Sequence, residues 1–513
     1  MSRHTAMRVA PTAVAAVLAL IYVIAAPASL DLAAHLFRAK LFAAEGYGLW
    51  DNWWYAGHNV TAYSVLFEPV AAALTPQLTA ALAAVASAAT FEALAYGMLR
   101  RRAYLASLWF GAATATELFT GRLTFAFGLA PALGAVLALQ RRRPKTATGL
   151  AFLTALASPV AALFAALAGI AYAAGTHRWR TGLGVVAAAL VPVALLAIAF
   201  PEGGTFPFAF SALWPLLVIA AVAIPTTRRH PTLRAAIALY TIGCVAAFVL
   251  HTPIGANAAR LGTLTAGPVA ALLIVDRRVL LAVAAPLLYL QFEPPIRDLV
   301  DQSGDPSTAP AYYRPLLTFL NRQPGPPFRI EIPPTRFHYE TYEVAPHYPL
   351  ARGWERQLDI KYNDLFYAGP LTAATYDAWL HQQAVRFVAV ADAPLDYAAK
   401  TETALIDRGL PYLRPVGRTG HWRIYAVRDA TPIVTGAATL TSIGPNSLTL
   451  LATRPGDAFV RVHFTPYWTL GTGHGCVQPT GQFTELRLRD AGPAQLTIGF
   501  AFNRIGAHSP RCN

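Results

Sequence analysis

The residues best suited to chemistry follow the first long apolar run of the chain. Asp31, His35 and Arg38 are spaced four and three residues apart, so a helix lying along a membrane surface would present all three on one face. A carboxylate here can act as a general base or hold a divalent ion, and Arg38 could hold a phosphate. We take Asp31 as a candidate catalytic residue and metal ligand, and His35 and Arg38 as candidate substrate-binding residues.

Aromatic residues crowd the loop that continues from this helix. Trp53 and Trp54 lie within the cluster Trp50–Tyr55, and His58 follows it. Such rings suit the face of a sugar, and they also suit the aromatic belt that membrane proteins place at the level of the lipid headgroups. Trp53, Trp54 and His58 are therefore candidate substrate-binding residues. The belt is the alternative for the tryptophans, and a structural hydrogen bond is the alternative for His35 and His58.

Two later polar segments approach from the same predicted side. Glu117 and Arg122 lie between two apolar runs, and Asn257 and Arg260 stand beside the start of another. An ionisable residue held at membrane depth is costly, so each is a functional candidate. Glu117 is the candidate second acid, and Arg122, Asn257 and Arg260 are candidates for binding the substrate. The alternatives are that Glu117 only pairs with Arg122 and that Arg260 anchors a lipid headgroup.

The elements that must position these residues are apolar helices. The chain has 513 residues, 55% of them hydrophobic and 13% charged, with a mean hydropathy of +0.40. Its Ala/Leu/Val runs end near Phe292, and several reach the roughly 20 residues that a bilayer crossing needs. We expect residues 1–292 to be a polytopic α-helical membrane bundle of about 11 membrane segments.

The net charge of +14 comes from basic residues whose positions indicate the topology of the chain in the membrane. The basic excess lies almost wholly in residues 1–292, in short clusters such as Arg100–Arg102 and Arg141–Arg143 between apolar runs. This is the positive-inside pattern, so we predict no nucleic-acid partner and a multi-pass protein of the cell membrane. The N-terminus is expected in the cytoplasm and the C-terminal domains outside it.

The sequence after residue 292 has the patterns of folded extracytoplasmic domains. Helical and strand patterns alternate up to about residue 430, and short strand patterns bounded by Gly, Pro and Asn follow. We predict an α/β domain over 293–432 and a C-terminal β-sandwich over 433–513. Cys476 and Cys512 would form a disulfide in this oxidising location, with two unpaired thiols as the alternative.

This arrangement resembles the GT-C superfamily of membrane glycosyltransferases. The resemblance rests on Asp31 at the mouth of the first span, the helix that carries His35 and Arg38, the long aromatic loop, the segment Glu117–Arg122 and the external tail. It implies a polyprenyl-phosphate sugar donor and a glycan or lipid acceptor of the cell envelope. It also implies that Asp31 is the catalytic base or a ligand of Mg²⁺ or Mn²⁺, and that Glu117 is the second acid. The chain departs from the commonest family pattern because no adjacent acid pair follows Asp31.

Two other classes of protein remain open. A transporter or flippase would be expected to show internal repeats, which the sequence lacks. A non-catalytic scaffold of the envelope, binding glycan through its tail, is the third reading. No phosphate-cradling Gly-rich loop, nucleophile elbow or His/Cys metal spacing occurs in the sequence.

Overall fold

The computed structural model describes residues 3–100 and 102–512 and divides the chain into two compact units. Unit 1 comprises residues 1–43, 62–197 and 203–303, and it is helical. Unit 2 comprises residues 44–61, 198–202 and 304–513, and it holds the sheets. Two short segments that connect helices of unit 1 therefore belong to unit 2.

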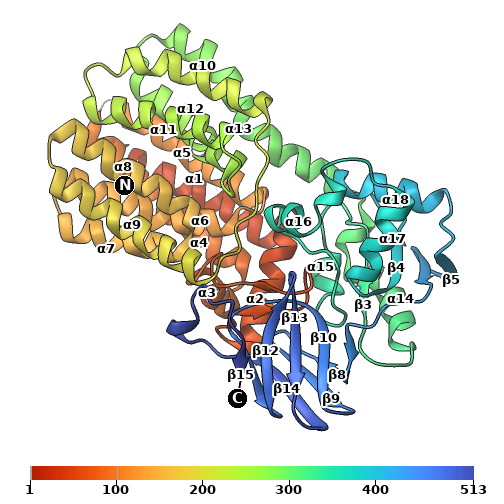
Figure 1. The fold of residues 1–513 in the computed structure, drawn as a ribbon. Coiled ribbons are helices and arrows are strands. Elements are labelled where there is room, and N and C mark those ends of the chain that lie inside the picture. The colour runs from red at the N-terminus through yellow and green to blue at the C-terminus, as the bar shows by residue number, and fades with distance from the viewer. Residues whose placement is uncertain (1–2, 101, 513) are drawn as a thin grey trace. The chain divides into compact units, whose positions relative to one another are not determined.

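Unit 1 is a set of helices that pack side by side (Figure 1). In chain order they are α1 Arg3–Ala25, α2 Leu32–Glu45, α3 Phe67–Leu74, α4 Pro76–Met98, α5 Ala103–Phe119, α6 Leu123–Gln140, α7 Pro144–Ala157, α8 Pro159–Thr176, α9 Trp179–Ala199, α10 Phe210–Thr226, α11 Pro231–Val249, the 3-10 turn η1 Gly255–Ala258, α12 Ala259–Leu273 and α13 Arg277–Gln302.

Proline marks where several of these helices begin. Pro76, Pro144, Pro159 and Pro231 each occupy the first turn of their helix, where the missing backbone N–H costs nothing. Ser158 ends α7 and also caps α8, because its hydroxyl accepts a hydrogen bond from the Ala161 nitrogen. The proline that follows Ser158 favours a break at this point, because it cannot continue the hydrogen bonding of α7.

Six of the described helices are long and apolar enough to cross a membrane: α4, α6, α8, α9, α11 and α13. The residues Val9–Ala25 of α1 and the helix α10 are apolar but shorter. In α4, α6 and α8 about half of the apolar window is buried, whereas in α9, α11 and α13 less than a fifth is. The first three are thus the inner helices, and the others present apolar faces outward, as lipid-facing helices do. The expected number of about 11 segments stays a prediction.

The expected boundary at residue 292 falls inside α13. This helix continues to Gln302, through Pro294 and Pro295, and unit 1 ends at Ser303. Gln291 holds it in the bundle: its side chain accepts a hydrogen bond from Trp109 Nε1 at 2.7 Å and donates to the carbonyls of Thr263 and Leu264. The charged residues after 292 mark a polar end of the same helix rather than the start of a domain.

The first part of unit 2 is the predicted α/β module. Its sheet has the order β3-β4-β6-β5, with β3 parallel to β4 and the other pairs antiparallel. The elements are α14 Pro310–Asn321, β3 Arg329–Glu331, α15 Glu340–Glu343, α16 Arg356–Tyr362, α17 Ala373–Gln382, β4 Val385–Ala391, α18 Lys400–Asp407, β5 Leu413–Thr419 and β6 Trp422–Val427.

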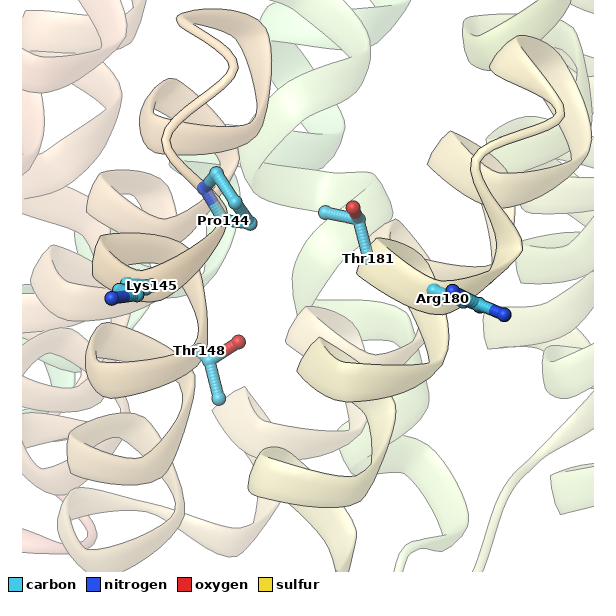
Figure 2. Close-up of a pocket in the computed structure, with 5 residues that line it drawn as sticks. All are labelled: Pro144, Lys145, Thr148, Arg180 and Thr181. Carbon is cyan, nitrogen blue, oxygen red and sulfur yellow. The ribbon is translucent and has the colours of Figure 1, made fainter.

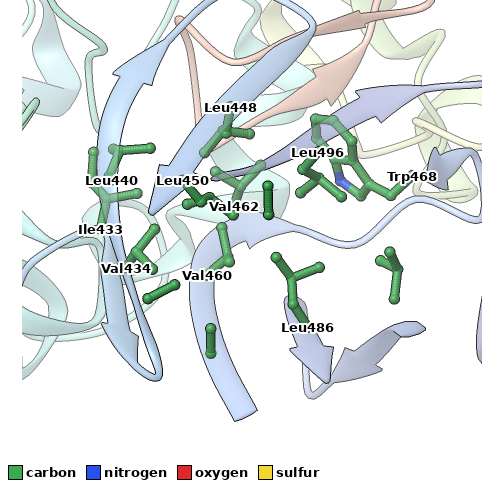
Figure 3. Close-up of a cluster of buried hydrophobic side chains, with 14 of the residues drawn as sticks. Ile433, Val434, Leu440, Leu448, Leu450, Val460, Val462, Trp468, Leu486 and Leu496 are labelled. Atoms are coloured by element: carbon green, nitrogen blue, oxygen red, sulfur yellow. The ribbon is translucent and has the colours of Figure 1, made fainter. Parts of the chain in front are cut away.

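The second part of unit 2 is a β-sandwich, as expected. Sheets of order β15-β12-β13-β10-β7 and β11-β14-β9-β8 enclose an apolar core that includes Leu450, Val460 and Leu486 (Figure 3). The strands are β7 Val434–Gly436, β8 Ala438–Ile443, β9 Ser447–Ala452, β10 Gly456–His463, β11 Trp468–Thr472, β12 Gly475–Thr480, β13 Phe483–Leu488, β14 Gly492–Ile498 and β15 Arg511–Cys512. A disulfide joins Cys476 on β12 to Cys512 on β15, where the two residues are register partners.

Candidate active site

Asp31 stands in a turn between α1 and α2 that is packed against the loop between α5 and α6. Gly121 of that loop has a φ of +75°, and a Cβ there would lie 2.3 Å from Ser29 Oγ and 3.3 Å from the Asp31 nitrogen. Only glycine combines this backbone conformation with so close an approach. The structure therefore brings the Asp31 turn and the segment between Glu117 and Arg122 together, as the proposed site requires.

The helix α2 turns His35 and Arg38 inward. Both side chains are buried. The Arg38 guanidinium lies 3.7 Å from the centroid of the Tyr63 ring, and the His35 ring packs edge-on against Phe67 at 5.3 Å. Burial and the Arg38 charge lower the pKa of His35 to about 3. His35 is thus neutral at physiological pH and able to act through hydrogen bonds rather than charge.

Glu117 and Arg260 are two oppositely charged residues of unit 1. Glu117 is 1% exposed, and within the described residues neither of its carboxylate oxygens has a hydrogen-bond partner. Its nearest cation is Arg122, at 3.9 Å. Arg260, from α12, interacts electrostatically with Arg122, Asp31 and Glu117. Among the described residues, the Arg260 side chain forms no hydrogen bond or ion pair, and its one ring contact is with Phe125, at 5.7 Å.

The idea that Glu117 and Arg122 only satisfy each other fits this geometry poorly. A direct ion-pair hydrogen bond is about 2.7–2.9 Å long, and theirs is 3.9 Å. Arg122 is also 30% exposed at its side chain. A guanidinium so placed can still bind an oxyanion from outside the protein.

Two further carboxyl groups belong to this neighbourhood. Glu68 on α3 is close enough to Arg38 to feel its charge, and burial raises its pKa to about 7. Asp298 on α13 is 6% exposed and feels the charges of Arg122 and Asp31. Sequence reasoning missed Asp298 because it places the end of the last span at residue 292. A helical pattern continued through the two prolines would have found it.

The described residues do not form an all-protein cation site. Nowhere among them do three or more His, Cys, Asp or Glu side chains gather in a way that could hold a metal. Mg²⁺ is usually bound by one or two carboxylates together with substrate phosphates. Asp31 fits such a partial role, in which the substrate would provide the other ligands. Asn257 is buried in η1 near Arg260 in the chain, and it is placed by a backbone hydrogen bond to Ile254.

Trp53, Trp54 and His58 belong to unit 2, whereas Asp31 belongs to unit 1. Trp54 is fully buried, donates from Nε1 to the Thr341 carbonyl at 3.3 Å, and stacks on His58. The Trp53 carbonyl accepts a hydrogen bond from the Leu350 nitrogen. These contacts give the aromatic loop a structural role that explains the residue types without a substrate. We therefore leave the three residues out of the proposed site.

Comparisons with known proteins give a likeness of fold. No protein-family model matches the chain, and no curated protein matches it either. A solved structure of the archaeal oligosaccharyltransferase AglB from Archaeoglobus fulgidus, in complex with an inhibitory peptide and a dolichol-phosphate, is similar with 12% identity and a TM-score of 0.39. The match covers 97% of this chain and 94% of that one.

A second similar structure is the Archaeoglobus fulgidus oligosaccharyltransferase in its apo form. Its identity is 11% and its TM-score 0.46, over 98% of this chain and 95% of that one. Scores of this size assign neither an activity nor the role of any residue.

Proposed function

We propose that this protein is a membrane glycosyltransferase that moves a sugar from a polyprenyl-phosphate donor to a glycan or lipid acceptor of the cell envelope. The observation that carries the proposal is the pair of opposite charges Glu117 and Arg260. They are close enough to interact electrostatically, and neither Glu117 oxygen has a hydrogen-bond partner among the described residues. Leaving a buried charge without a partner is expensive. Arg260 and Arg122 would bind the phosphate of the donor while the acceptor of the sugar lies beside Asp31 and Glu117. The substrates would then supply partners for these charges.

The proposed reaction is a displacement at the anomeric carbon of the sugar. The Asp31 carboxylate takes the proton of an acceptor hydroxyl as the hydroxyl oxygen attacks the anomeric carbon of the sugar. The bond from that carbon to the phosphate oxygen breaks, and its electron pair leaves with the polyprenyl phosphate. Arg122 and Arg260 stabilise the charge that grows on the leaving group. Glu117 is the second acid of the site.

Arg38 has a different role in this scheme from the one expected for it. Because its guanidinium is buried and stacked on Tyr63, it holds the α2 side of the site in place. Its charge also acts on Glu68 and His35. A bound Mg²⁺ or Mn²⁺ would add positive charge beside the phosphate, with Asp31 as its protein ligand.

The test is transfer by the purified full-length protein, offered a panel of polyprenyl-phosphate hexoses and pentoses with envelope glycan or lipid acceptors. Asp31→Asn should lower transfer by about 10²–10⁴-fold, the usual contribution of general base catalysis, and leave the melting temperature unchanged. Glu45→Gln is the matched control, since it removes an exposed carboxylate at the other end of α2 and should transfer normally. Full activity of Asp31→Asn, or transport without transfer by the wild type, would overturn the proposal.

A further inference from the structure

A pocket of about 430 Å³ opens between α7 and α9, apart from the residues of the proposed site. Pro144, Lys145 and Thr148 line it from α7, and Arg180 and Thr181 line it from α9. Figure 2 shows Thr148 and Thr181 bordering the space between the helices, while the charged ends of Lys145 and Arg180 are turned outward on either side of it. The pocket is thus bordered by two threonines, and a basic side chain stands on either flank with its charged end pointing away from the space.

The charge around this pocket is uncompensated. Six basic residues lie in two short segments there: Arg141, Arg142, Arg143, Lys145, Arg178 and Arg180. All six are exposed, and the sequence has no Asp or Glu from Arg141 to Pro201. A surface of this kind attracts anions strongly, by about 1 kcal/mol per Lys or Arg at a membrane.

The helices beside the pocket are apolar on their outer surfaces. Phe152 and Leu153 of α7 are 46% and 44% exposed, and Trp179 and Leu183 of α9 are 50% and 53% exposed. Gly149 opens the α7 side further, because a Cβ there would meet nothing within 4 Å. A ligand that fits both features carries a negative headgroup and hydrocarbon chains.

We propose that the α7–α9 pocket binds the headgroup of an anionic phospholipid. The lipid phosphate accepts hydrogen bonds from the hydroxyl groups of Thr148 and Thr181. On binding, the exposed side chains of Lys145 and Arg180 rotate from their outward positions toward the phosphate. The acyl chains lie along the exposed apolar faces of α7 and α9. A free phosphate would gain the polar contacts but none of the apolar ones. This site is independent of glycosyl transfer.

The test counts lipids retained by the full-length protein in detergent, by native mass spectrometry, after titration with dioleoylphosphatidylglycerol or dioleoylphosphatidylcholine. The wild type should retain phosphatidylglycerol in preference. The double variant Lys145→Gln/Arg180→Gln should bind it on the order of 25-fold more weakly, about fivefold for each cation. The matched control Arg228→Gln/Arg229→Gln removes an equally exposed basic pair that does not line the pocket, and should change binding less than about twofold.

Three results would overturn the proposal. Equal loss in both double variants would show attraction to general surface charge alone. Stabilisation of the wild type by inorganic phosphate as large as that by phosphatidylglycerol would show a site for a free anion. The third concerns Thr148→Leu/Thr181→Leu, which keeps every charge but removes both hydroxyl groups and narrows the pocket. This variant also decides the matter if the charge variants fail to fold. Undiminished phosphatidylglycerol binding by that variant would show that the pocket is not the binding site.

Discussion

Arg260 is the residue whose setting most distinguishes the proposed site from an ordinary packed bundle. It is partly buried in α12 and feels two acids and one arginine, yet the described residues give it only a ring contact at 5.7 Å. Structural arginines at this depth normally form hydrogen bonds with carboxylates or carbonyls. Arg352 in unit 2 does so, with two bonds to Asp359 and one to Glu402. The contrast suggests that Arg260 is kept available for a ligand.

Arg260→Ala should weaken use of the donor more than it weakens folding. A hydrogen bond to a charged group contributes about 1.5–3 kcal/mol, so kcat/KM for the polyprenyl-phosphate sugar should fall by about 10–100-fold. Arg260→Lys keeps the charge without the planar fork and should recover part of this loss. Steady-state kinetics against donor concentration measures the effect. Unchanged kcat/KM in Arg260→Ala would remove Arg260 from the site.

Gly121 tests whether the loop contact positions Asp31. A Cβ at this residue collides with Ser29 Oγ in a backbone conformation that favours glycine, so Gly121→Ala should destabilise the protein by about 1–3 kcal/mol. Because the collision is beside Asp31, transfer should fall further than stability explains. Gly149→Ala is the control: nothing lies within 4 Å of the added Cβ, and alanine in mid-helix adds about 0.5–1 kcal/mol. Thermal melting and transfer rates of the two variants separate the cases.

The candidate site could be predicted from sequence only as separate pieces. Asp31, Glu117 and Arg260 stand out because charged residues are rare in apolar runs, but no pattern states which of them meet. Burial cannot be read from a single helix either. Arg38 has the chemistry of a phosphate ligand, and only the packed structure reveals it stacked under Tyr63. Trp54 likewise suits a sugar by type, and its burial against Thr341 follows from contacts 287 residues apart.

Among the elements, the turn before α15 holds a buried histidine between two acids. His338 there has a φ of +59°, and its ring stacks on Trp354 at 3.4 Å. Its Nδ1 lies 3.6 Å from Glu340, and its Nε2 lies 3.5 Å from Asp396. Asp396 also binds Arg356 at 2.7 Å. When His338 is protonated, the two carboxylates of Asp396 and Glu340 therefore face two cations, His338 and Arg356.

This element should make unit 2 sensitive to pH. Burial opposes the charge on His338, but Asp396 and Glu340 outweigh it and raise its pKa above the ordinary 6.5. The stabilisation is fully present below pH 6.5 and is lost as the pH rises through the higher folded-state pKa. His338→Asn suits the positive φ and should cost about 1–2 kcal/mol near pH 6, with the difference shrinking at higher pH.

Melting of the full-length wild type and variant between about pH 5.5 and 9 gives the comparison. His421→Asn is the control, because His421 pairs with Asp392 at the surface, half exposed, where such pairs contribute little. A difference between wild type and His338→Asn that stays constant over the whole range would contradict the assignment.

Element prediction succeeded where periodicity is strong and failed where Pro and Gly interrupt it. The pattern of Trp422–Val427 predicts β6 with its bounds, and Ala373–Gln382 predicts α17. The strands β5 and β12 contain Pro415 and Pro479, residues that argue against a strand. In the structure β5 is an edge strand, where a missing N–H is tolerated. In β12, Pro479 pairs with Thr484 of β13 but lies beyond Cys476 and Val477, the two residues that pair with β15 among the described residues. It therefore also stands where a missing N–H is tolerated.

For the whole molecule, the distribution of basic residues makes a prediction about sidedness. Ser303 follows α13 at the start of the C-terminal part, which is predicted to lie outside the cytoplasm. In a Cys244→Ala background, Ser303→Cys should therefore react with a membrane-impermeant maleimide added outside intact cells. Thr226→Cys, beside Arg228 and Arg229, should react only after the membrane is opened. Labelling of Ser303→Cys from the cytoplasmic side alone would reverse the predicted topology.

The interleaving of the two units constrains how the chain can be made. Residues 44–61 are hydrogen-bonded to Leu350, Glu355, Gly444 and His463, and Trp50 packs on Trp468. Yet roughly 240 residues must be synthesised between this segment and the start of the C-terminal part, which takes on the order of 12–50 s at typical translation rates. During that interval its tryptophans have no core to enter. Biogenesis of this protein therefore needs either a chaperone that shelters the early loop or a translocation step that retains it until the last strands arrive.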